Sequence, residues 1–231
     1  WVLCGASGCG KTTLLRQLKP ALRPHGAAEG RILFDGQPLD DLPPHRQAAD
    51  IGFVLQSPEE QTVTDKVWHE LAFGLESLGC DTPSIRRRVA EMASFFGIQD
   101  WFHRKVDELS GGQKQLLALA SVMVLQPRLL ILDEPITGLD PTAIQEFYAM
   151  IRRLNREDKV AILMVSHDLR NAVEEANKIL HLQKRVLFYG PAGDYMNSRA
   201  AGHFFHEKEQ GICKSTAGCR RCCRAETEEK L

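Results

Sequence analysis

The sequence carries almost no net charge, because its 29 lysine and arginine residues nearly balance its 30 aspartate and glutamate residues. Proteins that bind nucleic acid usually show a basic excess, so this balance argues against that class. No apolar run approaches the roughly 18 residues that a membrane-spanning helix needs, and no signal-peptide pattern opens the chain. Internal repeats are also missing. Any role at a membrane must therefore come through a partner protein.

Cysteine is present, but its spacing does not indicate a disulfide framework. A chain of this size with mostly scattered cysteines fits a reducing, cytoplasmic compartment. Four of the seven cysteines crowd the polar C-terminal segment, and with His203 and His206 they could supply soft ligands to zinc. They form no paired Cys-x2-Cys knuckles, so we favour a tail, or a linker to a second domain, over a metal site. The scattered cysteines are Cys4, Cys9 and Cys80, and the C-terminal ones are Cys213, Cys219, Cys222 and Cys223.

Short apolar segments alternate with helical patterns along the chain, which predicts an α/β fold. We expect strands at 1–4, 31–34, 51–55, 129–132, 160–165, 179–182 and 186–189, the last two as a closing hairpin, and helices at 11–18, 82–96, 113–125 and from 141 onward. Thr82 with Pro83 is a typical helix start, and so is Asp140 with Pro141. Because Trp1 stands directly in the first apolar segment, we expect it to be a buried strand residue of a fragment that lacks its natural start.

A glycine-rich loop follows the first expected strand and precedes the first expected helix. It fits the pattern G-x-x-x-x-G-K-[ST], which binds phosphate in this strand–loop–helix context. Glycines let backbone N–H groups wrap a polyphosphate, Lys11 reaches the β- and γ-phosphates, and the Thr12 hydroxyl can ligate Mg²⁺. The alternative is a glycine-rich turn with an incidental lysine and threonine. We predict that nucleotide is bound by Gly5, Ala6, Ser7, Gly8, Cys9, Gly10, Lys11, Thr12 and Thr13.

Two carboxylates, Asp133 and Glu134, follow the apolar segment 129–132. Ligands of open α/β sheets bind at the carboxyl ends of strands, so both side chains are expected at the site. In a phosphate-loop protein the first carboxylate holds Mg²⁺ through water. The second is placed to polarise the attacking water, so Glu134 is the predicted general base. The alternative is that both are strand-end acids that face solvent.

A second anion-binding helix start is predicted at Ser110, which is a good N-cap. Gly111 and Gly112 follow it and leave the backbone N–H groups of the first turn accessible to an anion. Two phosphate-binding helix starts in one chain make sense if they face different nucleotides, or one nucleotide from two chains.

These motifs, with Gly138–Asp140 and Ser166–Asp168 after them, occur in an order that resembles the ATP-binding cassette (ABC) ATPase family. The resemblance implies a P-loop NTPase (RecA-like) core sheet with an ABC helical subdomain at about 60–115. It covers a domain at 1–191, which leaves 192–231 as a tail or linker. It also implies that two cassettes, identical or different, pair head to tail and that ATP lies between them.

The resemblance assigns the residues that reach the nucleotide of the partner cassette. Ser110, Gly111 and Gly112 contact the γ-phosphate in trans. Gln113 belongs to the same segment, and Asp140 is the aspartate that lies across the dimer interface.

The resemblance also assigns the catalytic residues and the metal ligands. Gln56 touches Mg²⁺ and the attacking water, and His167 contacts the γ-phosphate beside Glu134. The Mg²⁺ ligands are then Thr12, Gln56 and Asp133, and the cofactors are ATP and Mg²⁺.

The aromatic residue that stacks on adenine in this family lies upstream of the phosphate loop. Trp1 is too close to the loop for that task. We therefore expect the N-terminal part of the β-subdomain to be missing from this chain.

The segment from Gln56 to Gln61, with the following Val67–Glu76, resembles the energy-coupling factor (ECF) ATPases and their cobalt/nickel importer relatives. Those proteins pair with a transmembrane T-component and a substrate-binding S-component to import vitamins or metal ions. Trp68 and Phe73 are candidates for partner contact or for simple core positions. The resemblance implies a peripheral protein at the cytoplasmic face of the cell membrane.

Two other readings stay open within the ABC family. One is the ATPase of an exporter, and the other is a soluble ABC protein of chromosome maintenance or translation. Chromosome-maintenance relatives insert long coiled coils between the phosphate loop and the Ser110 segment, whereas only a compact helical stretch intervenes here. Translation-type relatives carry two cassettes per chain. The transported cargo does not follow from the sequence.

Overall fold

A six-stranded sheet forms the centre of the part of the chain that the computed structural model describes, which is residues 1–26, 29–167, 173–198 and 200–201. The strand order is β4-β5-β6-β1-β7-β8, and neighbouring strands are parallel except for the antiparallel pair of β7 and β8. The strands are β1 (Val2–Cys4), β4 (Ile51–Val54), β5 (Leu129–Asp133), β6 (Ala161–Val165), β7 (Lys178–Gln183) and β8 (Arg185–Pro191). The predicted α/β fold and closing hairpin are confirmed.

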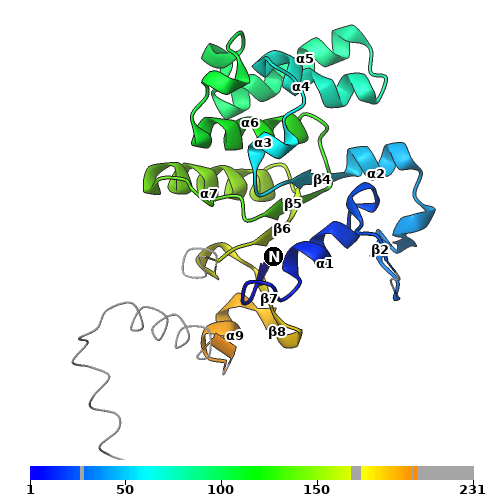
Figure 1. Cartoon of the computed structure of the whole chain (residues 1–231), viewed down its shortest axis with the longest axis vertical. Helices are drawn as coiled ribbons and strands as arrows, with labels where there is room; N and C mark the ends of the chain where they lie inside the picture. The colour runs from blue at the N-terminus through cyan, green and yellow to red at the C-terminus, as the bar shows by residue number, and fades with distance from the viewer. Residues whose placement is uncertain (27–28, 168–172, 199, 202–231) are drawn as a thin grey trace, which may run out of the picture.

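The helices gather in groups around this sheet, as Figure 1 shows. They are α1 (Lys11–Gln17), α2 (Pro44–Asp50), α3 (Pro58–Gln61), α4 (Val67–Ser77), α5 (Thr82–Phe96), α6 (Gly111–Met123), α7 (Pro141–Arg156) and α9 (Ala192–Met196). Helices α4, α5 and α6 form the upper end in Figure 1, and α9 lies beside β7 and β8 at the lower end. Within the described residues, no helix combines the length and the apolar character that crossing a membrane requires.

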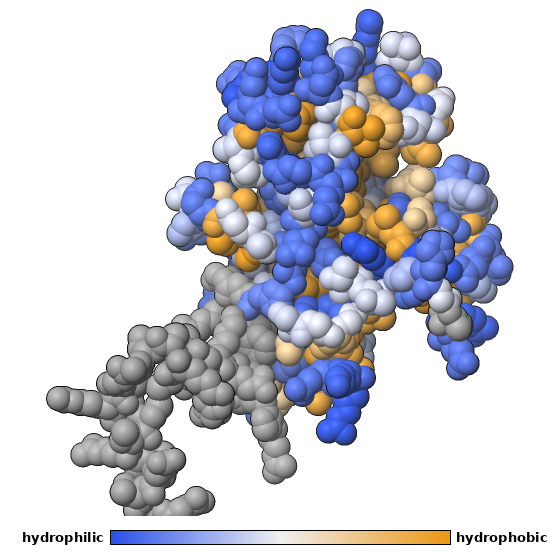
Figure 2. Space-filling model, viewed as in Figure 1, coloured by the Kyte–Doolittle hydropathy of each residue, from blue (hydrophilic) through white to orange (hydrophobic). Residues whose placement is uncertain are grey.

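Strand β5 shows why the sheet is covered on both faces. Leu130, Ile131 and Leu132 are each 0% exposed. Since side chains alternate along a strand, Leu130 and Leu132 join the apolar cluster of α4–α7, while Ile131 joins the cluster that contains Leu15 of α1. On the face shown in Figure 2, most of the outer surface is hydrophilic, and hydrophobic side chains gather in hollows between the helices.

Helix α5 begins one residue earlier than the sequence pattern indicates. The N-cap is Asp81, whose carboxylate accepts a hydrogen bond from Ser84 N over 3.1 Å, so Thr82 is already helical. A carboxylate is a strong acceptor near the positive end of a helix dipole, which favours Asp81 over the threonine hydroxyl. At the other end, Gly97 takes the left-handed conformation, φ 66°, and ends the helix as expected.

The strand expected at 31–34 is shorter in the structure. Only β2 (Leu33–Phe34) is formed, paired with β3 (Gln37–Pro38) across a tight turn at Asp35 and Gly36. Both turn residues have positive φ, as a two-residue hairpin loop of this type requires.

Trp1 is not the buried strand residue that its apolar neighbours predict. It precedes β1 and is 45% exposed. Its ring packs at a tilt against Tyr189 of the edge strand β8, with centroids 5.5 Å apart, and Lys178 Nζ lies 5.0 Å from the Trp1 ring centroid. Tyr189 is itself 55% exposed, so this contact leaves both rings partly accessible to solvent.

Candidate functional site

The predicted catalytic residues lie at one edge of the sheet, where several parallel strands end. Gln56 follows β4, Asp133 and Glu134 stand at the end of β5, and His167 follows β6. The glycine-rich loop leaves the carboxyl end of β1, the next strand in the sheet. The fold therefore brings together segments that are separated by up to about 160 positions in the sequence.

The glycine-rich loop curls around the side chain of Lys11, which is only 5% exposed. Lys11 Nζ donates hydrogen bonds to the carbonyl oxygens of Gly5 (3.1 Å) and Ala6 (3.0 Å). Gly8 and Gly10 have φ values of 75° and 99°, a region that residues with a side chain rarely adopt. Of the predicted nucleotide-binding residues, Ala6, Ser7, Gly8 and Thr13 are exposed, while Cys9, Gly10 and Thr12 are half-buried.

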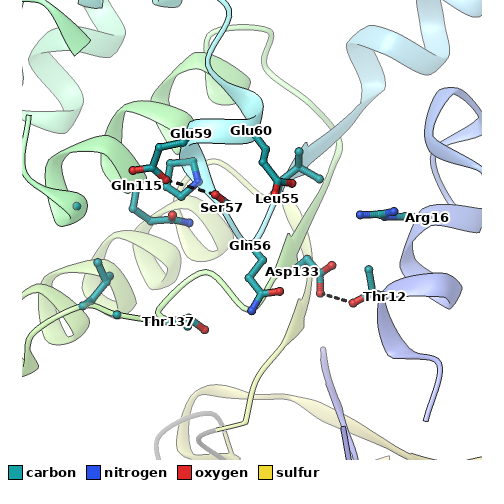
Figure 3. Close-up of a pocket in the computed structure, with 14 residues that line it drawn as sticks. Thr12, Arg16, Leu55, Gln56, Ser57, Glu59, Glu60, Gln115, Asp133 and Thr137 are labelled. Carbon is teal, nitrogen blue, oxygen red and sulfur yellow. Dashed lines mark hydrogen bonds between the residues drawn. The ribbon is translucent and has the colours of Figure 1, made fainter. Parts of the chain in front are cut away.

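Thr12 and Asp133 form the candidate Mg²⁺ site. Thr12 Oγ1 donates a hydrogen bond to Asp133 Oδ1 over 3.2 Å, and both side chains face the cavity shown in Figure 3. Asp133 is 2% exposed, and this burial raises the pKa of its carboxyl group. Hydroxyl and carboxylate oxygens are the ligands that Mg²⁺ prefers, so this donor set fits the ion. A nearby cation would also favour the ionised form of the buried carboxylate.

Glu134 is held from two sides. Gln56 Nε2 donates a hydrogen bond to Glu134 Oε2 over 3.1 Å, and His167 Nε2 lies 2.5 Å from Glu134 Oε1. The backbone of Glu134 has a φ of 50°, which is uncommon for a residue with a side chain. The structure thus places Glu134 in contact with both of the other predicted catalytic residues.

The predicted trans segment begins helix α6 with a capping box. Ser110 Oγ accepts a hydrogen bond from Gln113 N (3.3 Å), and Gln113 Oε1 accepts one from Ser110 N (2.9 Å). Ser110, Gly112 and Gln113 line a cavity of about 440 Å³ that does not include the glycine-rich loop. Gly111 instead lines the cavity of Thr12 and Asp133. The two helix starts thus open largely onto different hollows of the same chain.

Asp140 is the N-cap of α7, as the Asp-Pro pair predicts. Its Oδ1 accepts hydrogen bonds from Thr142 N and Ala143 N, each 3.0 Å long. The Asp140 side chain is exposed and lines the same cavity as Ser110. Its role across a dimer interface remains a prediction.

The cavity of about 500 Å³ at Thr12 and Asp133 is also lined by polar residues that the sequence motifs did not identify, among them Arg16, Gln115 and Thr137. Arg16 lies one turn after Thr12 on α1, and its guanidinium points into the cavity in Figure 3. Gln115 is 3% exposed on α6, and its Nε2 has no hydrogen-bond partner within the part of the chain that the structure describes. The sequence did carry a signal for two of these residues. Arg16 stands four positions after Thr12 in a predicted helix, so the two share a helix face, and Gln115 is a polar residue within a mostly apolar helix.

The C-terminal cysteines and the residues His203 and His206 lie outside the described residues, as does Asp168. Cys4, Cys9 and Cys80 are free thiols. Among residues 1–26, 29–167, 173–198 and 200–201, no three His, Cys, Asp or Glu side chains gather closely enough to hold a metal ion by themselves.

Comparison with protein families finds one that matches most of the site. The family described as "ABC transporter" matches residues 1–137, which contain the glycine-rich loop, Gln56, the Ser110 segment and Glu134.

Similar proteins come from bacteria and archaea. A Bacillus thuringiensis protein is 44% identical over 188 residues, which are 81% of this chain and 34% of that protein. A Pyrococcus horikoshii protein is 33% identical over 208 residues, which are 90% of this chain and 78% of that protein. Both carry the provisional name of ABC transporter ATP-binding protein. The chain spans about a third of the length of its Bacillus relatives.

Two solved structures share the fold. The cbiO1 protein of Clostridium perfringens, part of the ABC transporter complex cbiONQ, has a TM-score of 0.75 and 29% identity and covers 87% of this chain and 80% of its own. A dimeric ATP-binding cassette in a post-hydrolysis state, with ADP and phosphate bound, has a TM-score of 0.70 and 23% identity. That second match covers 83% of this chain and 84% of the other and supports the fold alone.

Proposed function

The chain belongs to the ABC transporter family, and we propose that it is the ATP-hydrolysing component of a membrane importer of the ECF type. The observation that carries the ATPase part of this proposal is the contact of Gln56 and His167 with Glu134, beside the Thr12–Asp133 pair. The likeness to cbiO1, part of a transporter complex, supports the importer part.

Nucleotide binding is assigned to the loop between β1 and α1. The N–H groups of residues 5–13 surround the polyphosphate, and the buried Lys11 ammonium turns from its carbonyl partners to the β- and γ-phosphates. Thr12 and Asp133, with Gln56, would hold the Mg²⁺ ion. Bound there, Mg²⁺ neutralises charge that develops on the phosphates.

Hydrolysis is assigned to the three residues in contact at the strand ends. Glu134 accepts the proton of the attacking water as general base. Gln56 and His167 hold the two Glu134 carboxylate oxygens and thereby aim the base, and both lie where they can touch the water and the γ-phosphate. A γ-phosphate that draws Gln56 and His167 toward itself frees Glu134 for the water.

A second cassette is required to complete the site. Ser110, Gly112 and Gln113, with Asp140, line a hollow that excludes the loop of their own chain, which supports their action on the nucleotide of the partner. ATP then lies between the loop of one cassette and the Ser110 segment of the other. Closure on ATP and separation after hydrolysis supply the movement that a membrane partner receives.

The domain limits belong to this proposal. We assign residues 1–191 to the ATPase domain, about 60–115 to its helical subdomain, and 192–231 to a tail or linker, whose first helix, α9, packs on the sheet through Tyr195. We propose that a transmembrane T-component binds the surface between Gln56 and helix α4. This T-component would in turn pair with an S-component. Val63 and Phe73 on this surface are 64% and 40% exposed. We propose that the protein is a peripheral subunit at the cytoplasmic face of the membrane.

The ATPase assignment is tested by Mg²⁺-dependent phosphate release from the full-length protein, with an Asp133→Asn variant beside it. Asp133→Asn keeps the side-chain shape and an acceptor for Thr12 but removes the charge. We expect loss of hydrolysis in this variant. Equal rates in the two proteins would overturn the site.

The proposed contact with a membrane partner is tested by co-purification with a multi-span membrane protein encoded beside this chain. Val63→Asp and Phe73→Asp are expected to release that partner while ATP hydrolysis without the partner is unchanged. Val186→Asp, at a position 57% exposed on the distant strand β8, is the matched control. Retention of the partner by both test variants would contradict this contact.

A further inference from the structure

A buried polar contact lies beneath the start of the glycine-rich loop. Tyr195 of α9 is 0% exposed, and its hydroxyl lies 3.1 Å from His181 Nδ1 and 3.9 Å from Cys4 Sγ. Cys4 is 0% exposed and His181 is 4% exposed. Most of their neighbours are apolar, including Ile179 and Phe188.

Cys4 and His181 are opposite each other in the sheet. They are register partners in the parallel ladder of β1 and β7, so their side chains project from the same face. The Tyr195 hydroxyl touches both, which ties α9 to two neighbouring strands at one step of the ladder. The contact joins residues that are 191 positions apart.

This ladder step adjoins the first residue of the loop. Gly5 follows Cys4 with a φ of 148°, and a Cβ on Gly5 would lie 2.0 Å from the carbonyl oxygen of Leu182, the neighbour of His181. The loop therefore begins in direct backbone contact with β7. The carbonyl of Gly5 in turn accepts the hydrogen bond of Lys11 Nζ. A change in the spacing of β1 and β7 here would move both Gly5 and Lys11.

Burying three polar side chains is costly unless they bond to one another. Desolvation raises the pKa of Cys4 to about 12 and raises the pKa of Tyr195, so both stay neutral hydrogen-bonding groups at physiological pH. An apolar trio would pack at the same place without fixing an orientation. Polar groups that must meet in one geometry select a single arrangement of the surrounding elements.

The geometry points to Tyr195 as a positioning residue for the phosphate loop. Its hydroxyl sets the spacing of β1 and β7 where the loop begins, and so fixes the position in which the loop N–H groups meet a polyphosphate. This inference rests on the proposed function, because it takes the loop to be the nucleotide site. Tyr195 acts through Cys4 and His181 and touches no nucleotide.

The test is Tyr195→Phe in the full chain, which keeps the ring and removes the hydroxyl. The Kd for MgATP, measured with a fluorescent ATP analogue and by competition with ATP, is expected to rise about threefold to tenfold, because binding must then order a loop that the wild-type contact already holds in place. The kcat of the assembled ATPase is expected to change less than about twofold, since the groups around Glu134 are untouched.

Tyr148→Phe is the matched control. Tyr148 is a 5% exposed tyrosine of α7, outside the loop and its contacts. A purely structural role for Tyr195 predicts that both variants lower Tm and that neither changes the Kd, and this result would overturn the inference. A second arm uses a His181→Leu background, in which Tyr195→Phe is expected to add no further rise in Kd. Additive effects on the Kd would also overturn it.

Amide hydrogen exchange separates this inference from the proposed function. Tyr195→Phe is expected to speed exchange at residues 4–8 relative to wild type, whether or not nucleotide binds. If the wild-type chain binds no MgATP, the proposed function fails, and exchange at these residues still decides the role of Tyr195. If Tyr195→Phe does not fold, Cys4→Ala removes the other side of the contact and is expected to change exchange in the same direction. Unchanged exchange would overturn the inference.

Discussion

Gln56 donates a hydrogen bond to Glu134, from Nε2 to Oε2 over 3.1 Å, and this bond joins the end of β4 to the end of β5. The other Glu134 oxygen lies 2.5 Å from His167 Nε2, beyond the end of β6. The proposed general base is therefore oriented by residues from both neighbouring strands. Such orientation matters because a base works only within hydrogen-bond reach of the proton that it removes.

Glu134→Gln is expected to bind ATP but to lose turnover by about 100-fold or more, since the amide keeps the shape and cannot accept the proton. Because ATP is no longer cleaved, a closed dimer should accumulate. Steady-state phosphate release and light scattering with ATP, on the full-length protein, measure both effects. Glu157→Gln, an exposed acid just after α7, is the matched control. Normal steady-state hydrolysis by Glu134→Gln would remove this residue from its role.

Ser110→Arg is expected to block hydrolysis without weakening ATP binding to a single cassette, because Ser110 is proposed to act on the nucleotide of the partner. The arginine would fill the hollow at the start of α6 and prevent closure. Hydrolysis and the Kd for ATP are measured on the same preparation. Ser94→Arg, at an exposed position of α5, controls for the added charge. An equal loss of binding and hydrolysis would argue against a site shared by two chains.

Local patterns were enough to predict the parts of the site that lie within a few residues of each other. The loop from Gly5 to Thr12, the cap at Ser110 and the cap at Asp140 each depend on neighbouring residues, and the structure forms all three caps and turns where they were expected. The roles assigned to these residues stay predictions. Helix α5 differs by one residue because two adjacent side chains, Asp81 and Thr82, both suit an N-cap.

Contacts between distant residues were not predictable in this way. In the sequence, no motif marks Tyr195 as a functional residue. Its hydrogen bond to His181 depends on where α9 lies against the sheet. Lys19 reads as a solvated charge after α1, yet it bonds carbonyls 28 to 32 positions away. The exposure of Trp1 has the same cause, because its surroundings come from β7 and β8.

Gly5→Ala is expected to disrupt the loop far more than Gly8→Ala. A Cβ on Gly5 would meet the backbone oxygen of Leu182 at 2.0 Å, which no side-chain movement can relieve, whereas a Cβ on Gly8 meets nothing within 4 Å. Gly8→Ala therefore suffers only the strain of a positive φ, about 1 kcal/mol. Thermal unfolding and the Kd for MgATP measure the two variants side by side. Similar losses in both would contradict the close packing of Gly5 on β7.

Lys19→Met is expected to lower the free energy of unfolding by about 1 kcal/mol, because it leaves partly buried carbonyl oxygens without this donor. Lys19 Nζ donates hydrogen bonds to the carbonyl oxygens of Gln47 (3.0 Å), Ala48 (3.2 Å) and Ile51 at the junction of α2 and β4. Methionine keeps the length of the side chain and removes the amine. Urea unfolding at pH 7 measures the loss, and Lys159→Met, at an exposed position after α7, is the control.

The same lysine predicts a rise of stability with pH. Burial lowers the pKa of Lys19 from 10.5 to about 8. Between these two values the unfolded chain keeps a proton that the folded chain has lost, so the unfolded state binds more protons and the free energy of unfolding rises with pH. Below about pH 8 and above about pH 10.5 both states carry the same charge on this group, and the effect levels off. Lys19→Met has no such group, so the stability of wild type minus that of the variant should increase from pH 8 to 10.5. A difference that falls over this range would mean that the carbonyls of Gln47, Ala48 and Ile51 hold the charged amine more strongly than burial disfavours it.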